Sequence, residues 1–188
     1  MSAAASRPMS LSEFLDWERE QELRWEFDGT GPVAMNGGSI AHSEIATNIV
    51  EALRARLRGG PCRAFRGDLK IIANGRVRYP DALVTCSAVT SAADIVPEPV
   101  VVFEVLSPST AGMDRIVKNA DYRATGLIRH YVMLEQGTMA ATVFSREGDD
   151  WAGHLVTGED VLALPALGVE LPLPVVYAGT GIDGADAV

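Results

Sequence analysis

Cysteine and histidine are scarce in this sequence, which leaves little material for disulfide or zinc chemistry. The 188 residues include two cysteines and three histidines. Cys62 and Cys86 are too few for a disulfide framework, and they lie too far from other ligand types to form a recognisable zinc site. We therefore expect both to be buried thiols in a reducing compartment.

Long hydrophobic runs are also missing. A membrane-spanning helix needs roughly 20 consecutive apolar residues, and no run approaches that length. The N-terminal stretch MSAAASRPMS has neither the basic start nor the apolar centre of a secretory signal. We therefore expect a soluble, cytoplasmic protein that has no membrane partner.

Several motifs of common enzyme classes are absent. The sequence has no G-x-S-x-G motif, no phosphate-binding P-loop and no cluster of cysteines with histidines. Catalysis by a nucleophilic serine or cysteine is therefore not supported, and we expect no organic cofactor.

Basic residues are in the minority, with 16 Lys and Arg against 25 Asp and Glu and a formal net charge of −9. This balance argues against a general nucleic-acid coat protein, because neutralising phosphate requires Lys and Arg. The basic residues concentrate in residues 54–78, where eight of them accompany a single acid, Asp68. The eight are Arg54, Arg56, Arg58, Arg63, Arg66, Lys70, Arg76 and Arg78.

This basic stretch has two interpretations. It suits a phosphate-facing surface on an acidic body, for which Arg66, Lys70, Arg76 and Arg78 are the candidate nucleic-acid contacts. Alternatively, it is a solvated helix face followed by a loop, and charge alone favours that interpretation.

The sequence does contain enough apolar material for one compact domain. It is 47% hydrophobic and has three Trp and five Phe residues, and its length is near that of a single domain. We expect residues 1–9 to be a flexible N-terminus and residues 10–177 to be the domain. Residues 178–188 are small, polar and acidic, so we expect a disordered tail.

Apolar spacing and turn residues predict an alternation of helices and strands. Ser10 and Glu13 form a capping-box pattern at the start of a helix over 10–23. Apolar residues at four-residue steps predict a second helix over 42–58, and a glycine-separated hairpin precedes it. The further elements are the hairpin strands over 25–28 and 32–35, a helix over 110–125, and strands over 69–72, 81–85, 100–106, 129–134, 138–144 and 151–156.

Glu104 is the most unusual residue of the predicted sheet, because it interrupts an otherwise apolar, central strand. A buried carboxylate is costly unless a cation or hydrogen-bond donors lie beside it. Asp81 begins the preceding strand, so both acids could lie at the same sheet end, where such a pair suits Mg²⁺ or Mn²⁺. Alternatively, Asp81 caps a turn and Glu104 pairs with an arginine such as Arg78.

Three further residues have both a functional and a structural interpretation. Lys118 lies four residues after Asp114, an ordinary ion-pair spacing, but it could instead point at the carboxylates and offset charge on a phosphoryl group. Lys70 is either a surface lysine or a phosphate contact. His42 is a possible acid or base, although a lone histidine without a partner motif is usually structural or exposed.

One block of motifs resembles the Uma-type family of putative restriction endonucleases, within the PD-(D/E)XK nuclease superfamily. It consists of Arg78-Tyr79-Pro80-Asp81, the strand and turn over 102–110, and the helix residues Asp114, Lys118 and Tyr122. The resemblance extends upstream to Arg24-Trp25-Glu26-Phe27, Val33-Ala34-Met35 and His42-Ser43, and downstream to Gly126 and Tyr131.

The resemblance implies an α/β fold with a restriction-endonuclease-like core, in which helices flank a mixed sheet. It implies a divalent metal on Asp81 and Glu104, with Glu26 near the same centre. The superfamily's lysine normally stands two residues after the second acid, where this chain has Leu106. In this branch of the superfamily, Lys118 is the implied substitute.

Two other positions depart from the family's pattern. Val132 stands where the family often has Trp, and Gly31 stands where it often has an acid. Neither position belongs to the implied metal centre. The changed hairpin at Gly31 could nevertheless reposition Glu26.

The resulting hypothesis is a DNA endonuclease whose catalytic residues are Asp81, Glu104, Lys118 and Glu26. A water activated by Mg²⁺ or Mn²⁺ would attack the phosphodiester bond. The expected partners are DNA and a second copy of the chain, because cutting both strands favours a homodimer. Two alternatives stay open: an inactive nuclease-fold module that binds DNA or protein, and a metal-dependent hydrolase of another phosphoester.

Overall fold

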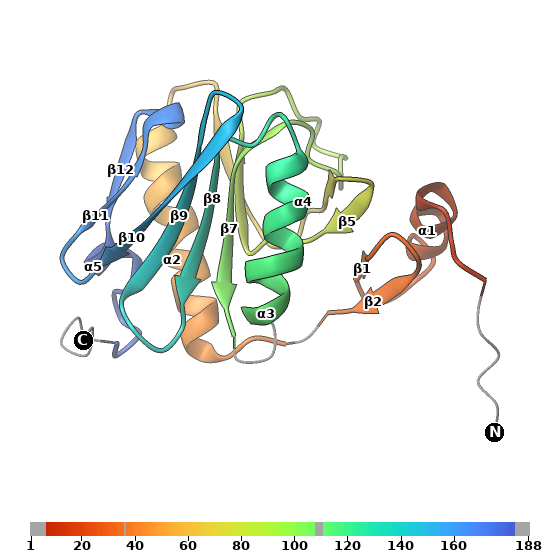
Figure 1. Ribbon diagram of the computed structural model, residues 1–188, viewed down its shortest axis with the longest axis horizontal. Coiled ribbons are helices and arrows are strands. Elements are labelled where there is room, and N and C mark those ends of the chain that lie inside the picture. The colour runs from red at the N-terminus through yellow and green to blue at the C-terminus, as the bar shows by residue number, and fades with distance from the viewer. Residues whose placement is uncertain (1–6, 36, 108–110, 183–188) are drawn as a thin grey trace.

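A six-stranded mixed sheet forms the centre of the protein (Figure 1). The computed structural model describes residues 7–35, 37–107 and 111–182. In the strand order β10-β9-β8-β7-β6-β3, β7 and β8 run parallel and the other neighbours run antiparallel. The strands are β3 (Arg63–Arg66), β6 (Ala82–Thr85), β7 (Pro99–Leu106), β8 (His130–Glu135), β9 (Ala140–Glu147) and β10 (Asp150–Thr157).

Helices cover both faces of this sheet, as expected for the α/β class (Figure 1). One face packs against α2 (Ile40–Leu57), and the other packs against α4 (Asn119–Ala124). A short α3 (Ala111–Met113) and a π-helical turn (Asp114–Lys118) lead into α4.

The central strand β7 distributes its side chains between the two faces. Val101, Phe103 and Val105 belong to the apolar cluster on the α2 side, whereas Val102 belongs to the cluster on the α4 side. Because side chains alternate along a strand, Glu104 points toward the α4 side. The expectation of a central strand covered on both faces is confirmed.

Two smaller sheets flank the central one. The first, in the order β2-β1-β5-β4, connects the N-terminal hairpin to the segment before β6, and the second is a hairpin of β11 and β12. α5 follows that hairpin and packs with it on the α2 side. The elements are α1 (Leu11–Glu18), β1 (Trp25–Phe27), β2 (Pro32–Ala34), β4 (Ile71–Ala73), β5 (Arg76–Arg78), β11 (Val161–Leu164), the 3₁₀ turn Pro165–Leu167, β12 (Val169–Pro172) and α5 (Leu173–Val176).

The first helix is shorter than the predicted span of 10–23. Its capping box is present: the Ser10 side chain accepts from the Glu13 backbone N–H, and the Glu13 carboxylate accepts from the Ser10 backbone N–H. The helix ends at Glu18, which is buried and bonds to Lys70 and Tyr79. The following turn leaves Leu23 71% exposed, so Leu23 does not belong to the apolar face that suggested a longer helix.

Several short helices and strands lack a sequence pattern that predicts them. β3 and β5 have arginine at both ends, and β11, β12 and α5 are four residues each. The predicted helix over 110–125 is interrupted by the π-helical turn, and residues 108–110, which include its predicted start, lie outside the described residues.

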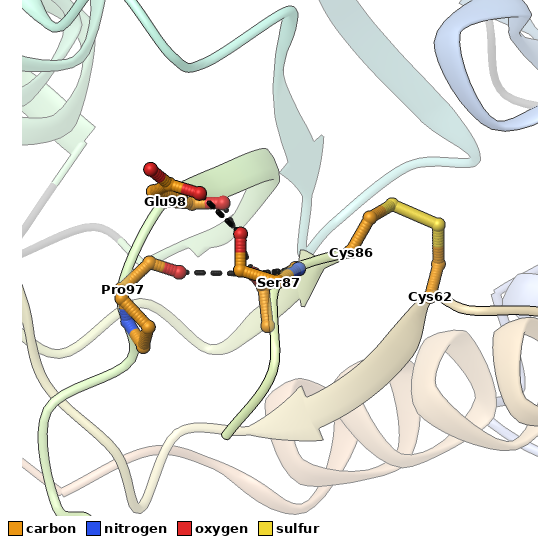
Figure 2. Close-up of a disulfide and its surroundings, with 6 residues drawn as sticks. Cys62, Cys86, Ser87, Pro97 and Glu98 are labelled. Carbon is orange, nitrogen blue, oxygen red and sulfur yellow. Dashed lines mark hydrogen bonds between the residues drawn. A yellow bond between two sulfur atoms is a disulfide. The ribbon is translucent and has the colours of Figure 1, made fainter.

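Cys62 and Cys86 form a disulfide, which corrects the expectation of two free thiols (Figure 2). They extend the antiparallel pairing of β3 with β6, where Arg63 lies opposite Thr85. The spacing of the cysteines did not predict this bridge, because 24 positions and four strands, β3 to β6, separate them in the sequence. Beside the bridge, the Ser87 hydroxyl donates to the Glu98 carboxylate (Figure 2).

The chain termini are described in part. The Asn48 side chain donates to the Ala178 carbonyl at 2.8 Å, and Thr180 N–H donates to the Tyr177 carbonyl at 3.2 Å. Residues 1–6 and 183–188 of the expected flexible ends lie outside the described residues. In the described ranges, no helix combines the length and apolar character that crossing a membrane requires.

Candidate metal centre and active site

Asp81 directly precedes β6 and Glu104 lies on the neighbouring strand β7, so the two acids meet at one sheet end as the sequence predicts. β6 and β7 pair antiparallel with Ala82 opposite Phe103, so the adjacent positions 81 and 104 face each other at this end of the sheet. The backbone N–H of Val105 donates to Asp81 Oδ2 at 2.7 Å. The β7 backbone thus holds one carboxylate beside the other.

Glu104 is buried and receives two hydrogen bonds. It is 3% exposed, and its Oε1 accepts from Lys118 Nζ at 3.1 Å and from the Tyr122 hydroxyl at 2.7 Å. Burial raises the pKa of Glu104 well above its usual value, Lys118 opposes that shift, and Asp81 and other nearby carboxylates reinforce it. The carboxylates that act on Glu104, those of Asp81, Asp114 and Glu26, thus outnumber the one lysine.

Lys118 points into the carboxylate cluster, where it forms both the i,i+4 ion pair with Asp114 and contacts with the carboxylates of Glu104 and Glu26. Its Nζ lies 3.1 Å from Glu104, 3.2 Å from Asp114 and 3.3 Å from Glu26. It sits in a π-helical turn, a feature frequent at functional sites. Burial alone would lower the pKa of Lys118, but the three carboxylates raise it, so the ammonium stays charged.

Glu26 reaches the centre from β1. Its carboxylate accepts from Arg78 Nη1 at 3.0 Å and from the Tyr79 backbone N–H at 3.2 Å. The hairpin with Gly31 is closed by the Asp28 carboxylate, which accepts from the Gly31 N–H at 2.9 Å. An acid at position 31, which the family often has, is therefore not needed to bring Glu26 to Lys118.

His42 belongs to the site, although its sequence context left its role open. Its Nε2 lies 3.2 Å from Asp81 Oδ2, and that hydrogen bond is the main reason why the pKa of His42 is raised against the opposing effect of burial. The Ser39 cap and a glycine place the ring, since a Cβ at Gly38 would lie 2.7 Å from His42 Nδ1. The available signal was a histidine just after a glycine-rich turn at a helix start.

A pocket of about 220 Å³ opens over these side chains. Its lining contains four carboxylates, one lysine and one histidine together with several apolar side chains. The charged groups and the histidine are Glu26, Asp81, Glu104, Asp114, Lys118 and His42, and the apolar residues include Val33, Ala34, Met35 and Met113.

The donor set fits an open site for a hard divalent cation. Within the described ranges, no three His, Cys, Asp or Glu side chains already converge as a metal cage. However, buried Asp114 Oδ1 has only the ion pair with Lys118 at 3.2 Å and no hydrogen bond in the described residues, and the pocket's carboxylates outnumber its cations. Mg²⁺ commonly binds through one or two carboxylates and keeps several waters, so Asp81 and Glu104 suit it without further protein ligands.

Two of the expected nucleic-acid contacts are buried ion pairs instead, which corrects both expectations. Lys70 is 5% exposed and bonds to Glu18 at 2.7 Å and to Asp94 at 2.8 Å. Arg78 is 2% exposed and joins Glu26 to Asp121. Their charges are neutralised inside the protein, so neither side chain is available to a phosphate backbone.

The other two expected contacts differ from each other. Arg76 is partly exposed but pairs with Asp121 and donates to the Asp28 carbonyl at 2.7 Å. Arg66 is exposed, lies on β3 opposite Ala82, and donates to the Ser43 hydroxyl at 2.8 Å. Arg66 is thus the member of this set that combines solvent exposure with a place beside the pocket.

Comparisons with known proteins agree with this fold. The family model described as Uma2, putative restriction endonuclease, matches residues 11–175. Two uncharacterized proteins of Synechocystis sp. are similar: slr1290 is 30% identical over 175 residues (91% of this chain, 92% of the relative), and sll1609 is 24% identical over 166 residues (85% and 94%). The crystal structure of a putative nuclease from Anabaena variabilis covers 92% of this chain and 99% of its own, with a TM-score of 0.75 and 17% identity, and so shares the fold. The chain belongs to the Uma2 family of putative restriction endonucleases.

Proposed function

We propose that this protein is a Mg²⁺- or Mn²⁺-dependent DNA endonuclease whose catalytic residues are Asp81, Glu104, Lys118 and Glu26. The observation that carries this proposal is the buried Glu104, held between Asp81 and Lys118 in a pocket with surplus carboxylates. A divalent cation relieves such a surplus, and a phosphodiester hydrolase uses one.

Asp81 and Glu104 would hold the ion, which supplies Lewis-acid activation of a water and of the scissile phosphate. The protein keeps both ligands in place through the Val105 N–H on Asp81 and the Tyr122 hydroxyl on Glu104. These bonds leave oxygen lone pairs on both carboxylates for a further partner.

Lys118 and Glu26 would act on the substrate side of the pocket. Lys118 keeps its proton, so it can offset charge that grows on a phosphoryl group. Its present partners are carboxylates, and it must exchange one of them to contact a substrate. Glu26 is anchored by Arg78 and can orient a water or the lysine.

DNA is the proposed substrate on the strength of the family, whose description names endonucleases. Cutting both strands of a duplex suits two copies of the chain, and we include a homodimer in the proposal. Two rival functions are a nuclease-fold module that binds without cutting and a hydrolase of another phosphoester. A single cleavage experiment distinguishes both from the proposed endonuclease.

The test is cleavage of plasmid, linear duplex and single-stranded DNA, and of nucleotide phosphoesters, with Mg²⁺, Mn²⁺ or EDTA. Wild type should cut DNA only with the metal, and Glu104→Gln and Lys118→Ala should each lose at least about 100-fold in rate. The control Glu51→Ala changes an exposed acid on α2 and should keep full activity. Mn²⁺ titration should show weaker binding by Glu104→Gln. Equal cleavage by all variants would contradict the assigned site, and cleavage of nucleotides alone would favour the other hydrolase.

A further inference from the structure

The basic stretch over 54–78 divides into two parts with opposite environments. Its last three members, Lys70, Arg76 and Arg78, all form ion pairs with carboxylates of the protein. The first five are exposed, and none has a carboxylate oxygen within 4.0 Å anywhere in the described part of the chain. These five are Arg54, Arg56, Arg58, Arg63 and Arg66.

Three of the five arginines line a groove of about 370 Å³ at the end of α2. Arg54, Arg58 and Arg63 contribute to its wall, together with Gly59 and Gly60, and no acidic residue lines it. The positive charge of this groove is therefore not offset locally, although the whole protein carries −9.

The groove is held in a defined shape. Arg54 Nε donates to the Ala64 carbonyl at 3.2 Å, and the Arg63 guanidinium lies 5.0 Å from the centre of the Phe65 ring. The disulfide ties Cys62, which also lines the groove, to the end of β6 (Figure 2). An anion entering the groove would meet arginines on an anchored loop.

The groove and the carboxylate pocket lie at opposite ends of the same elements. α2 starts beside the pocket, which His42 lines, and ends at the groove, which Arg54 and Arg58 line. The separation is about 24 Å along the helix from His42 to Arg58 and about 13 Å along β6 from Asp81 to Thr85. Arg66 lies between them, since β3 runs from the groove toward Ala82.

We propose that the groove formed by Arg54, Arg58 and Arg63 binds backbone phosphates of the DNA that is cut in the pocket. The inference rests on the proposed nuclease function for the identity of the ligand. With about 3.4 Å per base pair, the contact falls about four to seven base pairs from the scissile bond, and Arg66 contacts the backbone in between.

Two structural roles could also place arginines here. Cations stabilise a helix C-terminus, and charged side chains protect an edge strand such as β3 from pairing with other chains. Both roles affect stability or aggregation and leave DNA affinity unchanged, so DNA binding discriminates between them and the proposed role.

The experiment measures the affinity of full-length protein for a fluorescent duplex in EDTA, at several salt concentrations. The pair Arg58→Gln with Arg63→Gln should bind at least about tenfold more weakly at 0.1 M salt and flatten the salt slope by about two, because each phosphate contact contributes about 0.9. Replacing both arginines by lysine should largely restore affinity, since lysine keeps the charge. The matched control is Arg19→Gln with Arg24→Gln, which removes the same charge from exposed arginines elsewhere.

Each outcome decides a separate question. Unchanged affinity of the groove pair, or equal loss in the control pair, overturns the groove while leaving the nuclease proposal intact. Weaker binding by the groove pair, with unchanged binding by the control pair, supports the groove whether or not wild type cuts DNA. Absence of DNA cleavage by wild type with any metal would overturn the nuclease proposal and leave the groove supported. If wild type does cut, trimming the DNA to fewer than about four base pairs beside the cut should slow wild type and leave the groove pair unaffected.

Discussion

Arg78 provides a residue-scale prediction about stability. Arg78→Met removes the cation shared by the buried carboxylates of Glu26 and Asp121, so the free energy of unfolding should fall by about 3–5 kcal/mol. Arg76→Met should lose about 1 kcal/mol or less, because Arg76 is partly exposed and Asp121 keeps Arg78. Urea unfolding at neutral pH measures both losses, and equal losses would show that the buried network is not what Arg78 stabilises.

The same buried charges show which residues a sequence can and cannot assign. Glu104 was conspicuous because an acid inside an apolar strand needs a partner, and its partners are Lys118 and Tyr122. Lys70 and Arg78 were misassigned because their partners are distant in the chain: Glu18 is 52 residues from Lys70, and Asp121 is 43 residues from Arg78. Charge density along a sequence does not reveal whether such charges are already neutralised inside the fold.

At the scale of elements, length and apolar content decided what could be predicted. α2 and β7 are long and strongly patterned, and both were predicted close to their observed bounds. β3 and β5 were missed because each is short and carries arginines at its ends. The π-helical turn that aims Asp114 and Lys118 at the carboxylates leaves no periodicity signal over five residues. The approach of Asp81 to Glu104 could be predicted because Glu104 lies on a recognisable strand and Asp81 directly precedes another, whereas the placement of His42 depends on a cap and a turn.

The start of β8 provides a prediction about pH. His130 Nε2 accepts from the Ala166 N–H at 3.3 Å, and Nδ1 lies 2.9 Å from the Ser145 hydroxyl. Burial, and secondarily His154, lower the pKa of His130 below 6.5. The unfolded chain therefore takes up a proton at this residue before the folded protein does, and stability falls as the pH drops below 6.5 toward the folded pKa. In urea unfolding at pH 7.5 and 5.5, His130→Gln should lose less stability on acidification than wild type, and an identical loss would contradict this assignment.

At the scale of the whole molecule, the fold class was predictable and the connections between its parts were not. The mixed sheet with helices on both faces follows from the order of helices and strands together with the motif resemblance. The assembly of β1, β2, β4 and β5 into a separate sheet depends on pairings between distant segments that lack a local signal. The same is true of the disulfide, which ties the basic groove at the start of β3 to the end of β6.

The disulfide between Cys62 and Cys86 provides the prediction at this scale. It closes a loop of 24 residues that contains the strands from β3 to β6, and the loss of chain entropy in the unfolded state predicts about 3.5 kcal/mol of stabilisation. Oxidised wild type should therefore unfold at higher urea than either reduced wild type or Cys62→Ser with Cys86→Ser, and a reducing agent should leave the double variant unchanged. Mass spectrometry should confirm the bridge in oxidised wild type. If the urea midpoint of wild type is nevertheless the same with and without reductant, the bridge does not stabilise the protein by restricting the unfolded chain. Because the bridge lies outside the carboxylate pocket, the metal binding proposed for Asp81 and Glu104 should persist in the double variant under conditions where it stays folded.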